Sequence, residues 1–210
     1  MSDASLSPMP PEIEDLGRAA YPAVLARMRE LHAQVHAGAI SGRILFVEHD
    51  PVYTAGRATK AGDFGPEIVP IERGGKITFH GHGQLVVYPI VRLPRHDLRD
   101  WLRRFEAFGV ALCAAFGLAA EPSVDGTGVF VNGRKVASIG VAVKHWISLH
   151  GISINVAMDL TPFFAVRPCG LAPEIMSDLS TAAARAITLE EVKAAARAMV
   201  FVHLAPRNPV

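Results

Sequence analysis

The clearest β-hairpin of the chain is Val129-Phe-Val-Asn-Gly-Arg-Lys-Val-Ala-Ser-Ile-Gly-Val-Ala-Val143. Its two apolar runs are separated by Asn132-Gly133, and an Asn-Gly pair in that setting is the strongest short-range signal for a two-residue hairpin turn. Another strand is predicted at His150–Val156. The middle of the chain is therefore expected to form a β-sheet.

Further elements are predicted on both sides of this hairpin. Short extended segments are bounded by Gly, Pro and Asp, which are typical turn residues, and they lie at 43–49, 52–57, 68–72, 76–80 and 84–91. Apolar residues recur at three- and four-residue steps in 21–37 and 98–118, which predicts helices. A third helix is predicted at 188–201, with Thr188 and Glu191 as a capping box. Strands in the middle with flanking helices indicate an α+β fold, a mixed sheet packed with helices.

Composition indicates one globular domain. The chain has 210 residues, of which 50% are hydrophobic and 20% charged, so it can bury a substantial core. Residues 1–12 are rich in Ser and Pro and are expected to be a disordered tail, which leaves a single domain over 13–210. The net charge of +1 argues against nucleic-acid binding. An arginine cluster at positions 92, 95, 99, 103 and 104 is either a solvated helix face, the interpretation we prefer, or a surface for an acidic protein.

The sequence also predicts the cellular compartment of the protein. The first residues lack the basic and apolar regions of a signal peptide, and no apolar run is long enough to cross a bilayer. Two cysteines give no disulfide framework, so we expect a cytoplasmic protein with free thiols. Cys113 lies in an apolar helical run and is expected to be buried and inert.

The segment Arg73-Gly-Gly-Lys-Ile-Thr-Phe-His-Gly-His-Gly-Gln84 combines flexible backbone with polar side chains. Glycines let the backbone approach a ligand closely, which favours a binding site over an incidental glycine-rich hairpin. The segment lacks the Gly-Lys-Ser/Thr ending of a phosphate-binding P-loop. His80 and His82 form an H-x-H pair, but no third ligand stands at a telling spacing, so no metal is predicted.

Two further residues are candidates for chemistry. Lys135 opens an otherwise apolar strand, where an exposed lysine at a strand end is the ordinary interpretation. Cys169 lies between Pro168 and Gly170, which predicts a turn. A thiol in a turn is more exposed, and hence more reactive, than one in a core helix. From its own sequence context, Cys169 is equally compatible with a nucleophile and with an inert loop thiol.

Taken together, these motifs resemble the lipoyl(octanoyl) transferase family. The first block is Arg73-Gly-Gly-x-x-Thr-x-His-Gly-x-Gly-Gln84, and the second is Gly133-x-Lys135-x-Ala-Ser-Ile-Gly140. The third is His150-Gly151 running into Asn155-Val156, and the fourth is Pro168-Cys-Gly170. The segment 48–57 also fits, and the likeness covers roughly residues 15–185. The family pattern usually has Pro at the position of His82, and an acidic residue or Gln at that of Lys76.

The resemblance implies a fold like that of the biotin and lipoate ligases and a single catalytic domain. It implies transfer of an octanoyl or lipoyl group from acyl carrier protein to a lysine of a lipoyl domain, in 2-oxoacid dehydrogenases or the glycine-cleavage H protein. Cys169 is then the catalytic nucleophile that carries the acyl thioester, and Lys135 the catalytic amine that lowers the pKa of its thiol. No cofactor and no metal is implied, and we expect a monomer.

Substrate-binding residues are also implied by the resemblance. They are Arg73, Gly74, Gly75, Lys76, Ile77, Thr78, Phe79, His80, Ser138, Ile139, Gly140, Gly151, Ile152 and Ser153. Two alternatives remain open: an ATP-dependent lipoate ligase, which needs no nucleophilic cysteine, and a non-catalytic acyl-binding module.

Overall fold

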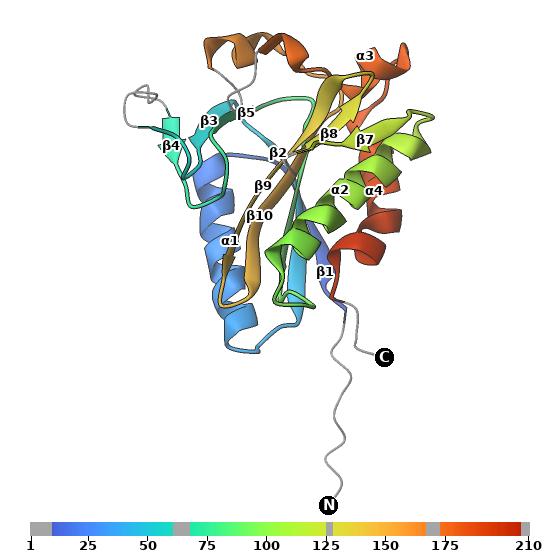
Figure 1. The fold of residues 1–210 in the computed structure, drawn as a ribbon. Coiled ribbons are helices and arrows are strands. Elements are labelled where there is room, and N and C mark those ends of the chain that lie inside the picture. The colour runs from blue at the N-terminus through green and yellow to red at the C-terminus, as the bar shows by residue number, and fades with distance from the viewer. Residues whose placement is uncertain (1–9, 61–67, 125–127, 167–172, 207–210) are drawn as a thin grey trace, which may run out of the picture.

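A computed structural model describes residues 10–60, 68–124, 128–166 and 173–206 (Figure 1). Its centre is a seven-stranded sheet in the order β1-β2-β6-β10-β9-β8-β7, and a three-stranded sheet in the order β4-β3-β5 lies beside it. The strands are β1 Glu12–Ala19, β2 Gly42–His49, β3 Val52–Ala55, β4 Ile68–Pro70, β5 Ile77–His80, β6 Gln84–Val91, β7 Ala120–Pro122, β8 Gly128–Val131, β9 Arg134–Lys144 and β10 Ile147–Asn155. The helices are α1 Tyr21–His36, α2 Leu98–Ala115, α3 Leu179–Ala183 and α4 Leu189–Leu204, with 3-10 turns η1 Thr161–Ala165 and η3 Pro173–Ile175.

The large sheet is mixed, as the sequence predicts. Strand β1 pairs with β2 in parallel, whereas β2–β6, β6–β10, β10–β9, β9–β8 and β8–β7 are antiparallel. The predicted hairpin is β8–β9, and its turn residues Asn132 and Gly133 have φ of 49° and 72°. Positive φ at both turn positions is what the Asn-Gly pair accommodates. The α+β prediction is confirmed.

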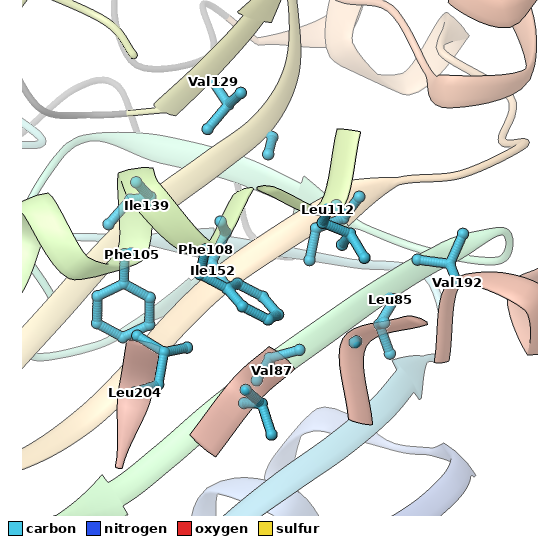
Figure 2. Packing of buried hydrophobic residues seen from close by; sticks show 14 of the residues in the cluster. Leu85, Val87, Phe105, Phe108, Leu112, Val129, Ile139, Ile152, Val192 and Leu204 are labelled. Carbon is cyan, nitrogen blue, oxygen red and sulfur yellow. The ribbon is translucent and has the colours of Figure 1, made fainter. Parts of the chain in front are cut away.

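Helices cover both faces of the large sheet (Figure 1). Successive side chains of a strand point to opposite faces, so Phe46 packs into the cluster that contains α2 and α4, and its neighbour Leu45 packs into the cluster that contains α1. Figure 2 shows the α2 and α4 side, where Phe105, Phe108 and Leu112 lie against strand residues such as Ile152. This apolar packing fixes the position of the strands that carry the site.

Local signals explain where the helices begin. Thr188 and Glu191 form the predicted capping box at the start of α4, each bonding the backbone N–H of the other. Helix α2 starts after Asp97, whose carboxylate accepts from the N–H groups of Arg99 and Asp100. Within the described residues, no helix is long and apolar enough to cross a membrane.

The two strands at the edges of the large sheet lack a clear sequence signal. Strand β1 has the sequence Glu-Ile-Glu-Asp-Leu-Gly-Arg-Ala, with four exposed or half-exposed polar side chains and a register shift between Asp15 and Arg18. Strand β7 has only three residues. Edge strands need a buried face less than central strands do, so alternation of apolar residues is weak there.

Candidate active site

A cavity of about 330 Å³ lies between the large sheet, the small sheet and the start of α2. This volume is at the small end of the range of ligand pockets. Its apolar walls include Val86 and Ile71 and, from α2, Leu98 and Leu102. Its polar groups include Arg73, which the glycine-rich segment supplies.

Small residues on two adjacent strands leave room for the cavity. In the β9–β10 register, Ser138 faces Ser153 and Gly140 faces Gly151. The intervening pair, Ile139 and Ile152, packs into the core on the α2 side. The small residues therefore leave space on one face of the strand pair, while Ile139 and Ile152 belong both to the core and to the apolar lining of the cavity.

Arg73 holds the glycine-rich segment against the small sheet. Its Nη2 donates to the Thr54 carbonyl at 2.8 Å and to the Thr54 hydroxyl at 3.0 Å, and its Nη1 donates to the Lys76 carbonyl at 2.7 Å. The Gly74 N–H donates to the Val141 carbonyl of β9 at 2.9 Å. Gly75 has φ of 79°, which only glycine adopts readily.

Most of the predicted substrate-binding residues surround this cavity. Those that line it are Arg73, Gly74, Gly75, Lys76, Thr78, His80, Ser138, Ile139, Gly140, Gly151, Ile152 and Ser153. Ile77 and Phe79 do not line it, since they alternate with Thr78 and His80 along β5. Phe79 instead packs against Phe163 of η1.

A buried hydrogen-bond chain fixes the proton position on His80. Gln84 Nε2 donates to Asn155 Oδ1 at 2.9 Å, and Asn155 Nδ2 donates to the Ser177 carbonyl at 2.9 Å. A backbone carbonyl only accepts, so the orientation of both amides follows. Gln84 Oε1 therefore faces His80 Nδ1 at 2.7 Å as an acceptor. His80 carries its proton on Nδ1, and Nε2 keeps its lone pair.

Burial also keeps this histidine neutral. Desolvation lowers the pKa of His80 to about 3, with a further contribution from the neighbouring His49. Desolvation likewise lowers the pKa of His49 to about 4, and His49 Nε2 lies 3.0 Å from the Tyr88 hydroxyl. Both imidazoles are uncharged at neutral pH, so at this pH they take part in hydrogen bonds without carrying charge.

His150 lines the cavity and lies close to the carboxylate of Glu72. It has φ of 61°, which is unusual for a non-glycine residue and often marks a functional site. Its Nε2 lies 3.7 Å from Glu72 Oε2, and Glu72 also pairs with Arg29 of α1 at 3.3 Å. The nearby His150 imidazole is the main reason that the pKa of Glu72 falls to about 2.

Lys135 is fully buried, and the interpretation as an exposed lysine at a strand end is wrong. Its side chain has 0% exposure, and within the described residues its Nζ has no hydrogen-bond partner. The absence of a side chain at Gly128 makes room for it, because a Cβ there would lie 2.5 Å from Lys135 Cε. An unpaired buried amine costs about 1–3 kcal/mol of stability, a cost that proteins tolerate chiefly at functional sites.

Of the two cysteines, Cys113 lies within the described residues and Cys169 lies outside them. The backbone of Lys135 forms an isolated parallel β-bridge with that of Met176, which comes seven residues after Cys169 in the sequence. The Lys135 carbonyl also accepts a hydrogen bond from the Ser177 N–H at 2.9 Å. The predicted burial of Cys113 is confirmed: it lies in α2, and desolvation raises the pKa of its thiol to about 12.

The H-x-H pair does not form a joint site. His80 is buried against Gln84, whereas the His82 side chain is half exposed and lies 3.9 Å from Asp50. In the parts of the chain that the structure covers, no three His, Cys, Asp or Glu side chains gather closely enough to hold a metal ion.

The sequence did not identify several residues of the cavity. They are Tyr21, Arg57, Tyr88, Leu98, Leu102 and His150. They come from α1, β6, β10, the start of α2 and the segment after β3, and only the fold brings these together. The sequence could have indicated Tyr88, because it stands in the apolar run of β6 and a buried hydroxyl needs a hydrogen-bond partner.

Comparison with known proteins identifies the family. The model for the lipoyl protein ligase A/B catalytic domain matches residues 20–200. An octanoyltransferase of Geobacter metallireducens is 40% identical over 186 residues, covering 86% of this chain and 87% of the relative. One of Pseudomonas fluorescens is 40% identical over 198 residues, covering 90% of each.

Solved structures show the same fold at low sequence identity. A putative lipoate protein ligase from T. acidophilum with bound lipoic acid has a TM-score of 0.73 at 17% identity, covering 93% of this chain and 86% of that one. A biotin protein ligase from Leishmania major, in complex with biotinyl-5-AMP, has a TM-score of 0.56 at 14% identity, covering 92% and 74%. With the family model matched over most of its length, this chain belongs to the lipoyl protein ligase A/B catalytic domain family.

Proposed function

We propose that the protein is an octanoyltransferase of protein lipoylation. It takes an octanoyl group from acyl carrier protein onto Cys169 as a thioester and passes it to a lysine of a lipoyl domain. Relatives named octanoyltransferase, about 40% identical over most of the chain, support this assignment. The acceptors are the lipoyl domains of 2-oxoacid dehydrogenases and the glycine-cleavage H protein, and the enzyme acts as a monomer in the cytoplasm.

The observation that carries the proposal is the buried amine of Lys135. Strand β9 holds this amine and also supplies Ser138, Ile139 and Gly140 to the cavity. The same strand is bridged to Met176, shortly after Cys169 in the sequence. This arrangement supports a pairing of the amine with the thiol, because an ammonium group favours the thiolate form of a neighbouring cysteine.

In the first half reaction, Lys135 accepts the thiol proton of Cys169. The thiolate attacks the thioester carbonyl of the donor, a new carbon–sulfur bond forms, and the bond to the carrier sulfur breaks. The carrier leaves as a thiolate and takes up the proton from Lys135. Charges and atoms balance, and one thioester replaces another.

In the second half reaction, the neutral amine of the acceptor lysine attacks the Cys169 thioester. A carbon–nitrogen bond forms, the carbon–sulfur bond breaks, and Lys135 accepts the proton that the amine loses. The amide product is more stable than the thioester, so this step is downhill. The apolar cavity walls hold the acyl chain, at about 0.8 kcal/mol for each buried CH₂.

Intact-mass measurement tests the covalent step. Incubation with octanoyl carrier protein is expected to add one octanoyl group, and an apo lipoyl domain should then remove it. Cys169→Ala should abolish the adduct, while Cys113→Ala, the matched control, should retain it. Lys135→Ala should slow transfer by about 10²–10⁴-fold. Full activity of that variant would remove Lys135 from the mechanism.

The fold is shared with lipoate ligases, so an ATP-dependent ligase is the second candidate. Octanoate and ATP, supplied without a thioester donor, discriminate between the two. A transferase forms no product from them, whereas a ligase does and tolerates Cys169→Ala. A non-catalytic acyl-binding module would bind octanoyl groups and modify nothing in either assay.

A further inference from the structure

The cavity has basic side chains but no acidic ones. Arg57, Arg73 and Lys76 line it, and no Asp or Glu does among the residues that the structure describes. Glu72, whose carboxylate lies 3.7 Å from His150 Nε2, is paired with Arg29. Because His80 is neutral, the charge of the cavity lining comes from cations, and these attract an anionic group.

Two of these cations lie at the mouth. Arg57 and Lys76 are both exposed, whereas Arg73 is buried. A backbone ladder holds the two segments together: the Gly56 N–H donates to the Lys76 carbonyl at 3.2 Å, and the Arg57 N–H donates to the Arg73 carbonyl at 3.0 Å. The two side chains therefore project from adjacent backbone segments that continue the β3–β5 pairing.

Neither mouth cation is matched by a carboxylate within the described ranges. The ion pairs found there involve other lysines and arginines, such as Lys193 with Asp15 and Arg104 with Asp100. A cation that lines an apolar cavity and has no carboxylate partner in the described part of the chain is available to a ligand. Lys76 also stands where the family pattern has an acidic residue or Gln, so this chain carries one more positive charge at the mouth.

We propose that Arg57 and Lys76 bind the phosphodiester group of a phosphopantetheine arm that delivers the acyl group. This inference rests on the proposed function. The octanoyl chain itself is uncharged and gives the cations nothing to bind. The anion of such a donor nearest to its thioester is the phosphate at the far end of the arm. With the acyl chain inside the cavity, the phosphate stays outside, where the exposed cations are.

The chemistry of the two side chains suits this ligand. A guanidinium group can donate two parallel hydrogen bonds to phosphate oxygens, and an ammonium group adds a point charge. At exposed positions, each contact is expected to change the rate of acylation by about two- to fivefold. Together the two cations give a preference of roughly tenfold for a phosphorylated arm.

The test compares three donors: octanoyl carrier protein, octanoyl-phosphopantetheine and octanoyl-pantetheine, which lacks the phosphate. The second-order rate of Cys169 acylation is measured by intact mass. Wild type should prefer octanoyl-phosphopantetheine over octanoyl-pantetheine by about tenfold. Arg57→Gln/Lys76→Gln should lose that preference, so that the ratio of its rates with the two small donors falls to about one. Arg185→Gln/Lys144→Gln, which removes the same charge from exposed positions outside the cavity, should keep it.

Three results would overturn the assignment. The first is equal wild-type rates with the two small donors. The second is an equal loss on both small donors in the double variant, which indicates a structural defect. The third is a loss confined to octanoyl carrier protein, which means that the cations bind the acidic surface of the carrier. If wild type forms no adduct with any donor, the proposed function itself fails, so the two failures are distinguishable.

Discussion

The interior beside α2 and α4 and the interior beside the small sheet differ in composition. The first contains Phe105, Phe108 and Leu112 packed on apolar strand residues. The second buries Arg73 and His80, whose side chains make hydrogen bonds, and His150, whose backbone has a positive φ. Apolar packing stabilises the fold on one side, and on the other side polar groups are retained at some expense of stability. Substitutions on the two sides should therefore have opposite consequences.

The largest effect on stability is expected on the apolar side. Phe108→Ala removes a fully buried ring and leaves a cavity, so the free energy of unfolding should fall by about 3–5 kcal/mol. Urea denaturation measures this. Phe201→Ala, at a partly exposed position of α4, is the matched control and should cost far less. A loss below 1 kcal/mol for Phe108→Ala would show that the core there relaxes.

Acidification should destabilise the polar side. The pKa of His80 is about 3 in the folded protein and near 6.5 when unfolded, so between these values only the unfolded chain binds the proton. The contribution of His80 to the free energy of unfolding is therefore complete above pH 6.5. It is lost as the pH falls toward 3, at about 1.4 kcal/mol per pH unit. His80→Gln should flatten this dependence. Denaturation at pH 7.0, 5.5 and 4.5 checks it, and equal slopes for both proteins would contradict it.

Lys135→Met should separate stability from activity. Methionine keeps much of the side-chain volume and removes a buried amine that has no hydrogen-bond partner among the described residues, so the free energy of unfolding should rise by about 1–3 kcal/mol. Octanoyl transfer should fall as for Lys135→Ala. Thermal denaturation and the intact-mass assay give the two readouts. A destabilised variant would mean that the amine has a stabilising partner.

The smallest effect is expected at Cys113. Its thiol has a raised pKa and no access to solvent, so iodoacetamide should not label it in the native protein. Cys113→Ala should cost about 1 kcal/mol and leave transfer unchanged. Peptide mapping after alkylation is the measurement, and a label on Cys113 under native conditions would show that α2 opens locally.

The central elements could be predicted from the sequence because their signals are local. Asn132-Gly133 specifies its turn, and Thr188 with Glu191 specifies the start of α4. Strand β1 was missed, since an edge strand with charged residues shows no alternation. The burial of Lys135 could not be predicted from the sequence either. It depends on the space that Gly128 of the neighbouring strand leaves, because glycine has no side chain.

From the pattern of its own residues, only the cavity segment between Arg73 and Gln84 could be predicted. The density of Gly and His between Arg73 and Gln84 marked a binding segment. Tyr21 and Tyr88 come from elements far apart in the sequence, and pairing information is needed to bring them to the same space. The family resemblance indicated Ser138 and Gly140 of β9 and Gly151 and Ser153 of β10, whereas their facing each other follows only from the register.

The paired glycines of β9 and β10 are not equivalent in what they permit. A Cβ on Gly151 would lie 2.1 Å from the Val87 carbonyl oxygen, a backbone atom that cannot yield. A Cβ on Gly140 would lie 2.9 Å from Arg73 Cδ and 3.5 Å from the Gly74 carbonyl oxygen, so its tightest contact is with a side chain. A side chain at position 140 is therefore less costly than one at position 151, but it would push against the arginine that holds the glycine-rich segment to the small sheet.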